Sequence, residues 1–146
     1  MKRNLRSMLD SREAAILGMT VIAISTIFFI AMLIIAFVQF LRDKPKDAFT
    51  RAHIGLLVGG LLLSINNYIL DIRVLSTTLT HRSMVVPHVW VNYVLLAVIL
   101  ILFVLSHVRL QSAVVIAKCK VLYFLTVLSV GLCVFFYWQW SFFGMV

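Results

Sequence analysis

Four apolar blocks, each about as long as a membrane-crossing helix, divide the sequence. They cover residues 14–41, 52–73, 88–106 and 121–143, and the termini and connections carry most of the charges. A helix needs about 20 apolar residues to cross the hydrocarbon core of a bilayer. Because 63% of the 146 residues are hydrophobic and 12% are charged, lipid rather than water is the expected solvent. The sequence therefore predicts an all-α integral membrane protein, with four transmembrane helices in two hairpins that form a single domain over residues 1–146.

The chain is strongly basic, with 13 Lys and Arg against 5 Asp and Glu. In a soluble protein this excess would favour nucleic acid as the partner, but basic residues at the ends of apolar blocks are typical of anchoring at anionic headgroups. We therefore expect the lipid bilayer as the partner and no nucleic acid. Four crossings would place six basic residues on one side, Lys2, Arg3, Arg6, Arg12, Arg73 and Arg82, and seven on the other, Arg42, Lys44, Lys46, Arg51, Arg109, Lys118 and Lys120. This near-equal division leaves the orientation open under the positive-inside rule.

The second block, 52–73, differs from the other three because polar and ionisable residues recur along it. At about 100° per residue, one face of a helix over this block carries a set that we call the polar stripe: His53, Gly60, Ser64, Asn67 and Asp71. An unsatisfied polar group in hydrocarbon costs several kcal/mol, so the stripe must face protein or water. We expect it at a helix interface or along a narrow aqueous path.

A second face of the same block carries Gly55, Gly59 and Asn66. Two glycines one helical turn apart let the backbone of another helix approach closely, because they present no side chain. We expect this pair to pack against another helix of the same bundle. Gly18 belongs to a row of small and polar residues in the first block, which predicts the packing face of that helix.

Aromatic residues gather at the block ends that four crossings would bring to one side of the membrane. Indole and phenol rings prefer the headgroup region, where an apolar ring and a polar edge are both accommodated. The expected interfacial anchors are Trp90, Tyr93, Trp138 and Trp140, with Tyr68 and Tyr137 in the same belt. The belt marks one membrane boundary without indicating which compartment it faces.

The residue types of a catalytic triad are present in His53, Ser64 and Asp71, but all three lie along one predicted helix. At 1.5 Å per residue, His53 and Asp71 would be about 27 Å apart, which is too far for one site. The sequence contains no G-x-S-x-G motif, no H-E-x-x-H motif and no phosphate-binding glycine loop. We therefore expect no catalytic residues and a protein that is not an enzyme.

The histidines make haem a cofactor to consider. Four crossings would place His53 and His107 on one side of the membrane and His81 and His88 on the other. Two helix-borne histidines hold a b-type haem between them in some bundles. Histidines at a membrane boundary also reach toward headgroups or cap helix ends, and the sequence has no haem attachment motif. We therefore expect no metal and no cofactor, and a haem-binding electron-transfer subunit is the third functional hypothesis.

Ion-coupled transport needs a carboxylate within the bilayer, and Asp71 is the one carboxylate inside the four blocks. Its neighbour Arg73 also fits an ion pair at the membrane boundary. A small transporter that uses Asp71 is therefore the second hypothesis. The preferred hypothesis is a non-enzymatic membrane subunit that self-associates or joins other membrane proteins, with a narrow pore as one form of that assembly.

Overall fold

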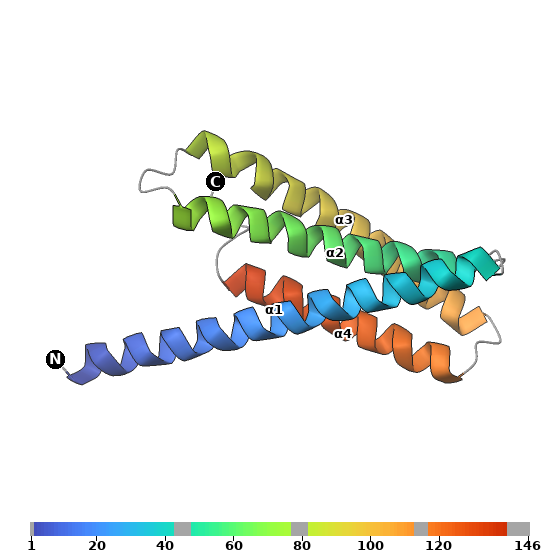
Figure 1. The fold of residues 1–146 in the computed structure, drawn as a ribbon, viewed down its shortest axis with the longest axis horizontal. Helices are drawn as coiled ribbons and strands as arrows, with labels where there is room; N and C mark the ends of the chain where they lie inside the picture. Colours follow the sequence, from blue (N-terminus) through green and yellow to red (C-terminus); the bar gives the residue numbers. More distant parts are fainter. Residues whose placement is uncertain (1, 43–47, 77–81, 113–116, 140–146) are drawn as a thin grey trace.

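The computed structural model is all-helical (Figure 1) and describes residues 2–42, 48–76, 82–112 and 117–139. Its helices are α1 (Lys2–Arg42), α2 (Ala48–Ser76), α3 (Arg82–Ser112) and α4 (Ala117–Gln139). Side chains are described over residues 16–39, 41, 48–70, 72, 85–111 and 119–138. Within these ranges, each helix contains a segment long and apolar enough to cross a membrane: Ile16–Gln39, Ala48–Leu70, Val85–Gln111 and Cys119–Trp138. The prediction of an all-α chain with four candidate membrane-spanning helices is therefore confirmed.

All four helices begin earlier than the apolar pattern predicts, α1 and α3 by the largest margins. α1 starts at Lys2, so about 21 Å of helix precedes the apolar segment at Ile16, and Figure 1 shows this end running past the other helices. α3 starts at Arg82 and contains Pro87, where the sequence predicts a connection. As the sixth residue of α3, Pro87 removes one backbone hydrogen bond, the one to the Ser83 carbonyl, and the helix nevertheless runs on to Ser112. Proline is therefore a weak stop signal at that position.

The centre of the bundle is α2. This helix packs against each of the other three, most extensively against α3, and α1 also packs against α4. Figure 1 shows α2 and α3 lying alongside each other, with α1 and α4 crossing on the other side of α2. The predicted pairing into two hairpins is not confirmed, because the extensive contact of α3 among the described residues is with α2 rather than with α4.

Burial follows the same arrangement. Inside the chain, 39% of the α2 span is buried, against 11% for α1 and 22% for each of α3 and α4. The fully buried apolar side chains of α2 include Leu56, Leu57, Leu63 and Leu70. Large apolar side chains of the other helices are exposed around this core, as expected where acyl chains rather than water surround a bundle. The residues that carry chemistry therefore lie along α2 and the faces packed on it.

Candidate functional site

Polar side chains meet between α2 and α3 in a group that we call the asparagine cluster: Asn66 and Asn67 of α2, with His88 and Asn92 of α3. Asn67 is 1% exposed and Asn92 is 0% exposed, so both amides lie inside the protein. Asn92 Oδ1 accepts hydrogen bonds from Asn66 Nδ2 at 2.8 Å and from Asn67 Nδ2 at 3.0 Å. Asn92 Nδ2 donates to Asn67 Oδ1 at 2.7 Å, so these two amides bind each other in both directions.

Backbone carbonyl groups fix the orientation of the two α2 amides. Asn66 Nδ2 donates to the His88 carbonyl oxygen at 2.9 Å, and Asn67 Nδ2 donates to the Leu63 carbonyl oxygen at 2.7 Å. Turning either amide over would place oxygen against oxygen, so the positions of both nitrogens follow from the geometry. Asn66 Oδ1 is then an acceptor, and His88 Nδ1, 2.7 Å away, must carry a proton and donate to it.

Within the asparagine cluster, hydrogen-bonding capacity is almost fully used. Asn66 and Asn67 each use both amide hydrogens and their oxygen, and Asn92 Oδ1 accepts two hydrogen bonds. Removing one partner would leave buried groups such as Asn67 or Asn92 unsatisfied, which costs more than the hydrogen bond itself contributes. The pattern in the second block points to Asn66 and Asn67. The third block places His88, Asn92 and Ser106 on one side of a helix, but that pattern does not indicate that Asn92 pairs with the two amides of the second block.

Toward the other end of α2 lies the His53 cluster, which consists of His53, Ser106, Tyr123 and Thr126. Thr126 Oγ1 donates to the Leu122 carbonyl oxygen at 2.9 Å, so its single hydrogen is used. His53 Nε2, 2.9 Å from Thr126 Oγ1, is therefore the donor in that hydrogen bond. The Tyr123 ring packs edge-on against His53 with centroids 5.8 Å apart, and its hydroxyl group is hydrogen-bonded to Ser106 at 3.2 Å. This cluster joins α2, α3 and α4.

The histidines considered as haem ligands have separate protein partners. His107 stacks on the Phe103 ring with centroids 5.8 Å apart, and its Nε2 lies 3.3 Å from Gln111 Nε2. His53 belongs to the His53 cluster and His88 to the asparagine cluster, while His81 lies outside the described residues. The part of the chain that the structure describes contains no group of three or more His, Cys, Asp or Glu side chains that could hold a metal ion.

Gly55 and Gly59 face α3. A Cβ atom added at Gly55 would lie 3.2 Å from the Leu102 side chain, and one added at Gly59 would lie 3.0 Å from Ile99. Both distances are shorter than ordinary contacts of a Cβ atom. The absence of a side chain at these positions therefore lets the two helices approach within the bundle, as Gly-x-x-x-Gly steps do elsewhere.

Gly60 faces the opposite side of α2. A Cβ atom there would lie 2.9 Å from the Phe29 ring of α1 and 3.1 Å from Val130 of α4. Gly18 of α1 is buried as well. The polar stripe thus combines hydrogen-bonding residues with a position where three helices come close together.

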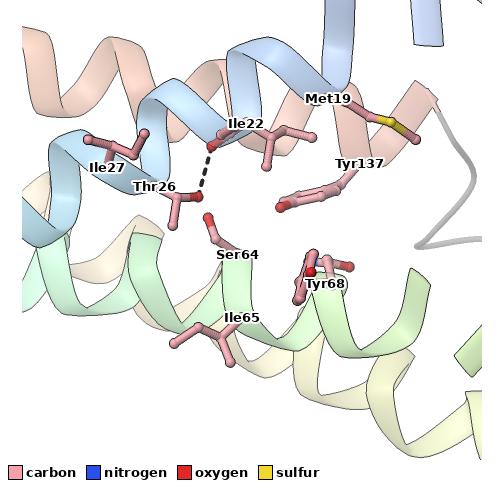
Figure 2. Close-up of a pocket in the computed structure, with 10 residues that line it drawn as sticks. Met19, Ile22, Thr26, Ile27, Ser64, Ile65, Tyr68 and Tyr137 are labelled. Carbon is pink, nitrogen blue, oxygen red and sulfur yellow. Dashed lines mark hydrogen bonds between the residues drawn. The ribbon is translucent and has the colours of Figure 1, made fainter. Parts of the chain in front are cut away.

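Beyond Gly60, the same side of α2 opens into a cavity of about 510 Å³ between α1, α2 and α4 (Figure 2). Its inner wall contains the buried residues Ser64, Asn67 and Tyr137. Its outer rim consists of exposed residues: Met19, Ile27, Ile65 and Tyr68. Since these rim residues lie in apolar spans, the cavity opens toward the surroundings of the helices.

Ser64 is the unusual member of the inner wall. Its side chain is 3% exposed, and its Oγ has no hydrogen-bond partner among the described residues. Thr20 and Thr26 of α1, by contrast, donate to the carbonyl oxygens four residues earlier at 2.8 Å. The Cys133 thiol lies near the hydroxyl groups of Ser25 and Ser64, but no atom satisfies hydrogen-bond geometry with Ser64 Oγ. Figure 2 shows the Ser64 hydroxyl group pointing from α2 toward α1.

The aromatic residues of the predicted belt divide into two groups. Trp90, Tyr93 and Trp138 are exposed, and the Trp90 and Tyr93 rings contact each other with centroids 6.3 Å apart. Tyr137 is 3% exposed and faces the cavity, because neighbouring positions on a helix point about 100° apart. Trp140 lies outside the described residues.

Asp71 belongs to α2, but its side chain lies outside the described part of the chain. The same holds for the side chain of Arg73, its predicted ion-pair partner. The structure describes the remaining members of the polar stripe. His53 faces α4, Gly60 faces α1 and α4, Ser64 faces α1, and Asn67 faces α3.

Comparison with models of protein families, with curated proteins and with solved structures finds no match for this chain. Inferences about its function therefore depend on the helix arrangement, the two polar clusters and the cavity.

Proposed function

We propose that this protein is a non-enzymatic subunit of a membrane assembly, in which the outer face of α3 contacts helices of a second copy or of a partner protein. The observation that carries this proposal is the one-sided packing of α3. This helix packs extensively against α2, and the described residues show no comparable packing of α3 against α1 or α4. A helix with one extensive neighbour has most of its circumference available for others.

The outer face of α3 has a spacing suited to helix pairing. Val94, Val98, Ile101 and Leu105 are exposed and follow one another at intervals of four, three and four residues. This is the alternation by which side chains of two helices interlock in left-handed pairs. In a bilayer, lipid chains also cover such an apolar face, so burying it does not remove it from water. Association with a partner helix must therefore be stabilised by close packing of the interlocking side chains.

The placement of polar groups favours this role over a pore. A pore needs polar side chains directed at water, whereas the asparagine and His53 clusters direct theirs at each other between helices. Likewise, His53 bonds to Thr126 while Ser64 faces the cavity, so the two residue types needed for nucleophilic catalysis lie in different surroundings. The first observation supports a structural role for the hydrogen-bonded members of the polar stripe, His53 and Asn67, and the second speaks against catalysis.

Site-specific photocrosslinking in native membranes tests the proposal. A benzophenone amino acid at Ile101 samples the outer face of α3, and the same residue at Ile30 samples an exposed position of α1. We expect Ile101 to give adducts enlarged by a second polypeptide chain and Ile30 to give lipid adducts. Lipid adducts alone at both positions, together with a monomeric mass in detergent, would contradict the proposal.

A further inference from the structure

The cavity between α1, α2 and α4 has the properties of a ligand site rather than of a packing defect. Small-molecule sites are typically about 300–1,000 Å³, mostly apolar, and contain a few polar groups that orient the ligand. This cavity is about 510 Å³ and has apolar residues such as Ile22, Ala23 and Ile65 beside the polar atoms of Ser64 and Asn67. Its volume and composition both fall within that description.

The polar atom without a partner indicates what the ligand must supply. Ser64 Oγ is buried in α2 beside the Cys133 thiol, and no atom of the described residues accepts its hydrogen in hydrogen-bond geometry. Thr26 on the facing helix, by contrast, satisfies its own hydroxyl group with a backbone carbonyl. A buried hydroxyl group that donates to nothing costs about 1–3 kcal/mol. An oxygen atom brought in by a ligand would remove that cost. The ligand should therefore carry a hydrogen-bond acceptor, for which a carbonyl oxygen is well suited.

The lining of the cavity also sets the charge of the ligand. Every described residue that lines it is uncharged, from Met19 and Thr26 on α1 to Tyr68 and Tyr137 at the other end. A charged group in such surroundings would lose its hydration without gaining a counter-ion. The ligand is therefore neutral.

The position of the cavity along the helices sets the route of entry. Tyr68 and Tyr137 lie close to the ends of their apolar segments, Ala48–Leu70 and Cys119–Trp138. Ser64 is six residues before Leu70, so its hydroxyl group lies about 9 Å inside that end of the span. Because the rim consists of exposed apolar residues, a molecule would enter sideways from the bilayer.

We propose that the cavity binds a neutral, lipid-soluble carbonyl compound whose oxygen accepts a hydrogen bond from Ser64 Oγ. This role goes beyond the assembly function and does not depend on it, because the cavity lies on the α1 side of α2 and the proposed docking face lies on α3. The ligand class covers uncharged acyl esters and other apolar carbonyl compounds. Charged amphiphiles such as fatty acid anions are excluded.

A matched pair of photoactivatable probes tests this proposal on the full chain in phosphatidylcholine nanodiscs. The first probe is the methyl ester of a diazirine-bearing palmitic acid, and the second is the same acid at pH 8, where its carboxylate is ionised. We expect the ester to label cavity residues such as Met19 and Ile65 saturably, with competition by unlabelled methyl palmitate. The acid should label them weakly. Labelling spread evenly over exposed positions, without saturation, would overturn the proposal by showing ordinary contact with surrounding lipid.

Two substitutions sharpen the test. Ala23→Phe fills the cavity from its exposed α1 side and should abolish saturable labelling, whereas Ala31→Phe, at an exposed α1 position outside the lining, should leave it unchanged. Ser64→Ala should weaken binding of the ester about fivefold, the equivalent of one hydrogen bond of about 1 kcal/mol. Unchanged affinity in Ser64→Ala would contradict the assigned role of the hydroxyl group. The crosslinking pattern at Ile101 should not change in any of these variants, which separates this proposal from the assembly proposal.

Discussion

The polar groups on the two sides of α2 have different surroundings. On the α3 side, glycines bring the helices together and the polar side chains satisfy one another, as in the contact of Asn67 with Asn92. On the α1 side, close packing at Gly60 gives way within one turn to a cavity, where the Ser64 hydroxyl group has no hydrogen-bond partner among the described residues. The polar stripe is therefore not one functional unit. Members such as Asn67, which face a hydrogen-bond partner, hold helices together, whereas Ser64, which faces the cavity, is available to bind a ligand.

The largest loss of stability is expected on the α3 side, when the shared acceptor of the asparagine cluster, Asn92, is removed. Asn92→Leu would leave the amides of Asn66 and Asn67 without their partner, and we expect the free energy of unfolding in detergent to fall by about 2–3 kcal/mol. The variant that also replaces Asn66 and Asn67 by Leu should recover part of this loss, because no unsatisfied amide remains. The recovery is incomplete because His88 Nδ1–H loses its Asn66 acceptor. A loss below about 0.5 kcal/mol for Asn92→Leu would mean that the cluster contributes little to stability.

The second test concerns close packing on the α3 side. Gly59→Leu places a side chain where a Cβ atom already lies 3.0 Å from Ile99, so we expect a loss of about 2 kcal/mol. Gly131→Leu is the matched control, because a Cβ atom at Gly131 meets nothing within 4 Å. Thermal unfolding of both variants in the same detergent gives the difference. Equal effects would show that the glycine contact is incidental.

The third test examines the His53 cluster. Thr126→Val keeps the shape of the side chain but leaves His53 Nε2–H without its acceptor, and we expect a loss of about 1 kcal/mol. Thr20→Val is the matched control, since Thr20 bonds to its own helix at an exposed position of α1. The control should change stability by less than about 0.5 kcal/mol. A larger loss in Thr20→Val than in Thr126→Val would contradict the assigned contact.

The smallest effect is expected on the α1 side. Ser64→Ala removes a hydroxyl group that makes no hydrogen bond, so stability without added ligand should stay within about 0.5 kcal/mol of the parent protein or rise slightly. Chemical denaturation of the purified protein in ligand-free detergent measures this. A loss above about 1 kcal/mol would show that Ser64 has a protein partner, and would remove the contrast between the two sides.

Much of this architecture follows from sequence patterns, and the remainder depends on how helices rotate against each other. Block length predicts the four candidate spans, and the spacing of Gly55 and Gly59 predicts a close helix contact. The pairing of Asn92 does not follow, because the polar side of the third block, with His88, Asn92 and Ser106, does not indicate which helix it meets. Tyr137 shows the same difficulty: composition places it at a membrane boundary, but a rotation of one residue separates an exposed ring from a buried one.

The position of α2 has a consequence for how these candidate spans would insert into a bilayer. α2 has the lowest mean hydropathy of the four spans, yet it is the most buried of them. Alone in lipid, it would expose the amides of Asn66 and Asn67 to acyl chains at a cost of several kcal/mol. Because α3 is synthesised after α2 and supplies Asn92, the second helix would gain a stable position in a bilayer only when the third arrives. Insertion of α2 should therefore depend on the two segments entering together. In a chain truncated before residue 92, the second segment should insert poorly, while the more apolar α1 span still anchors the chain.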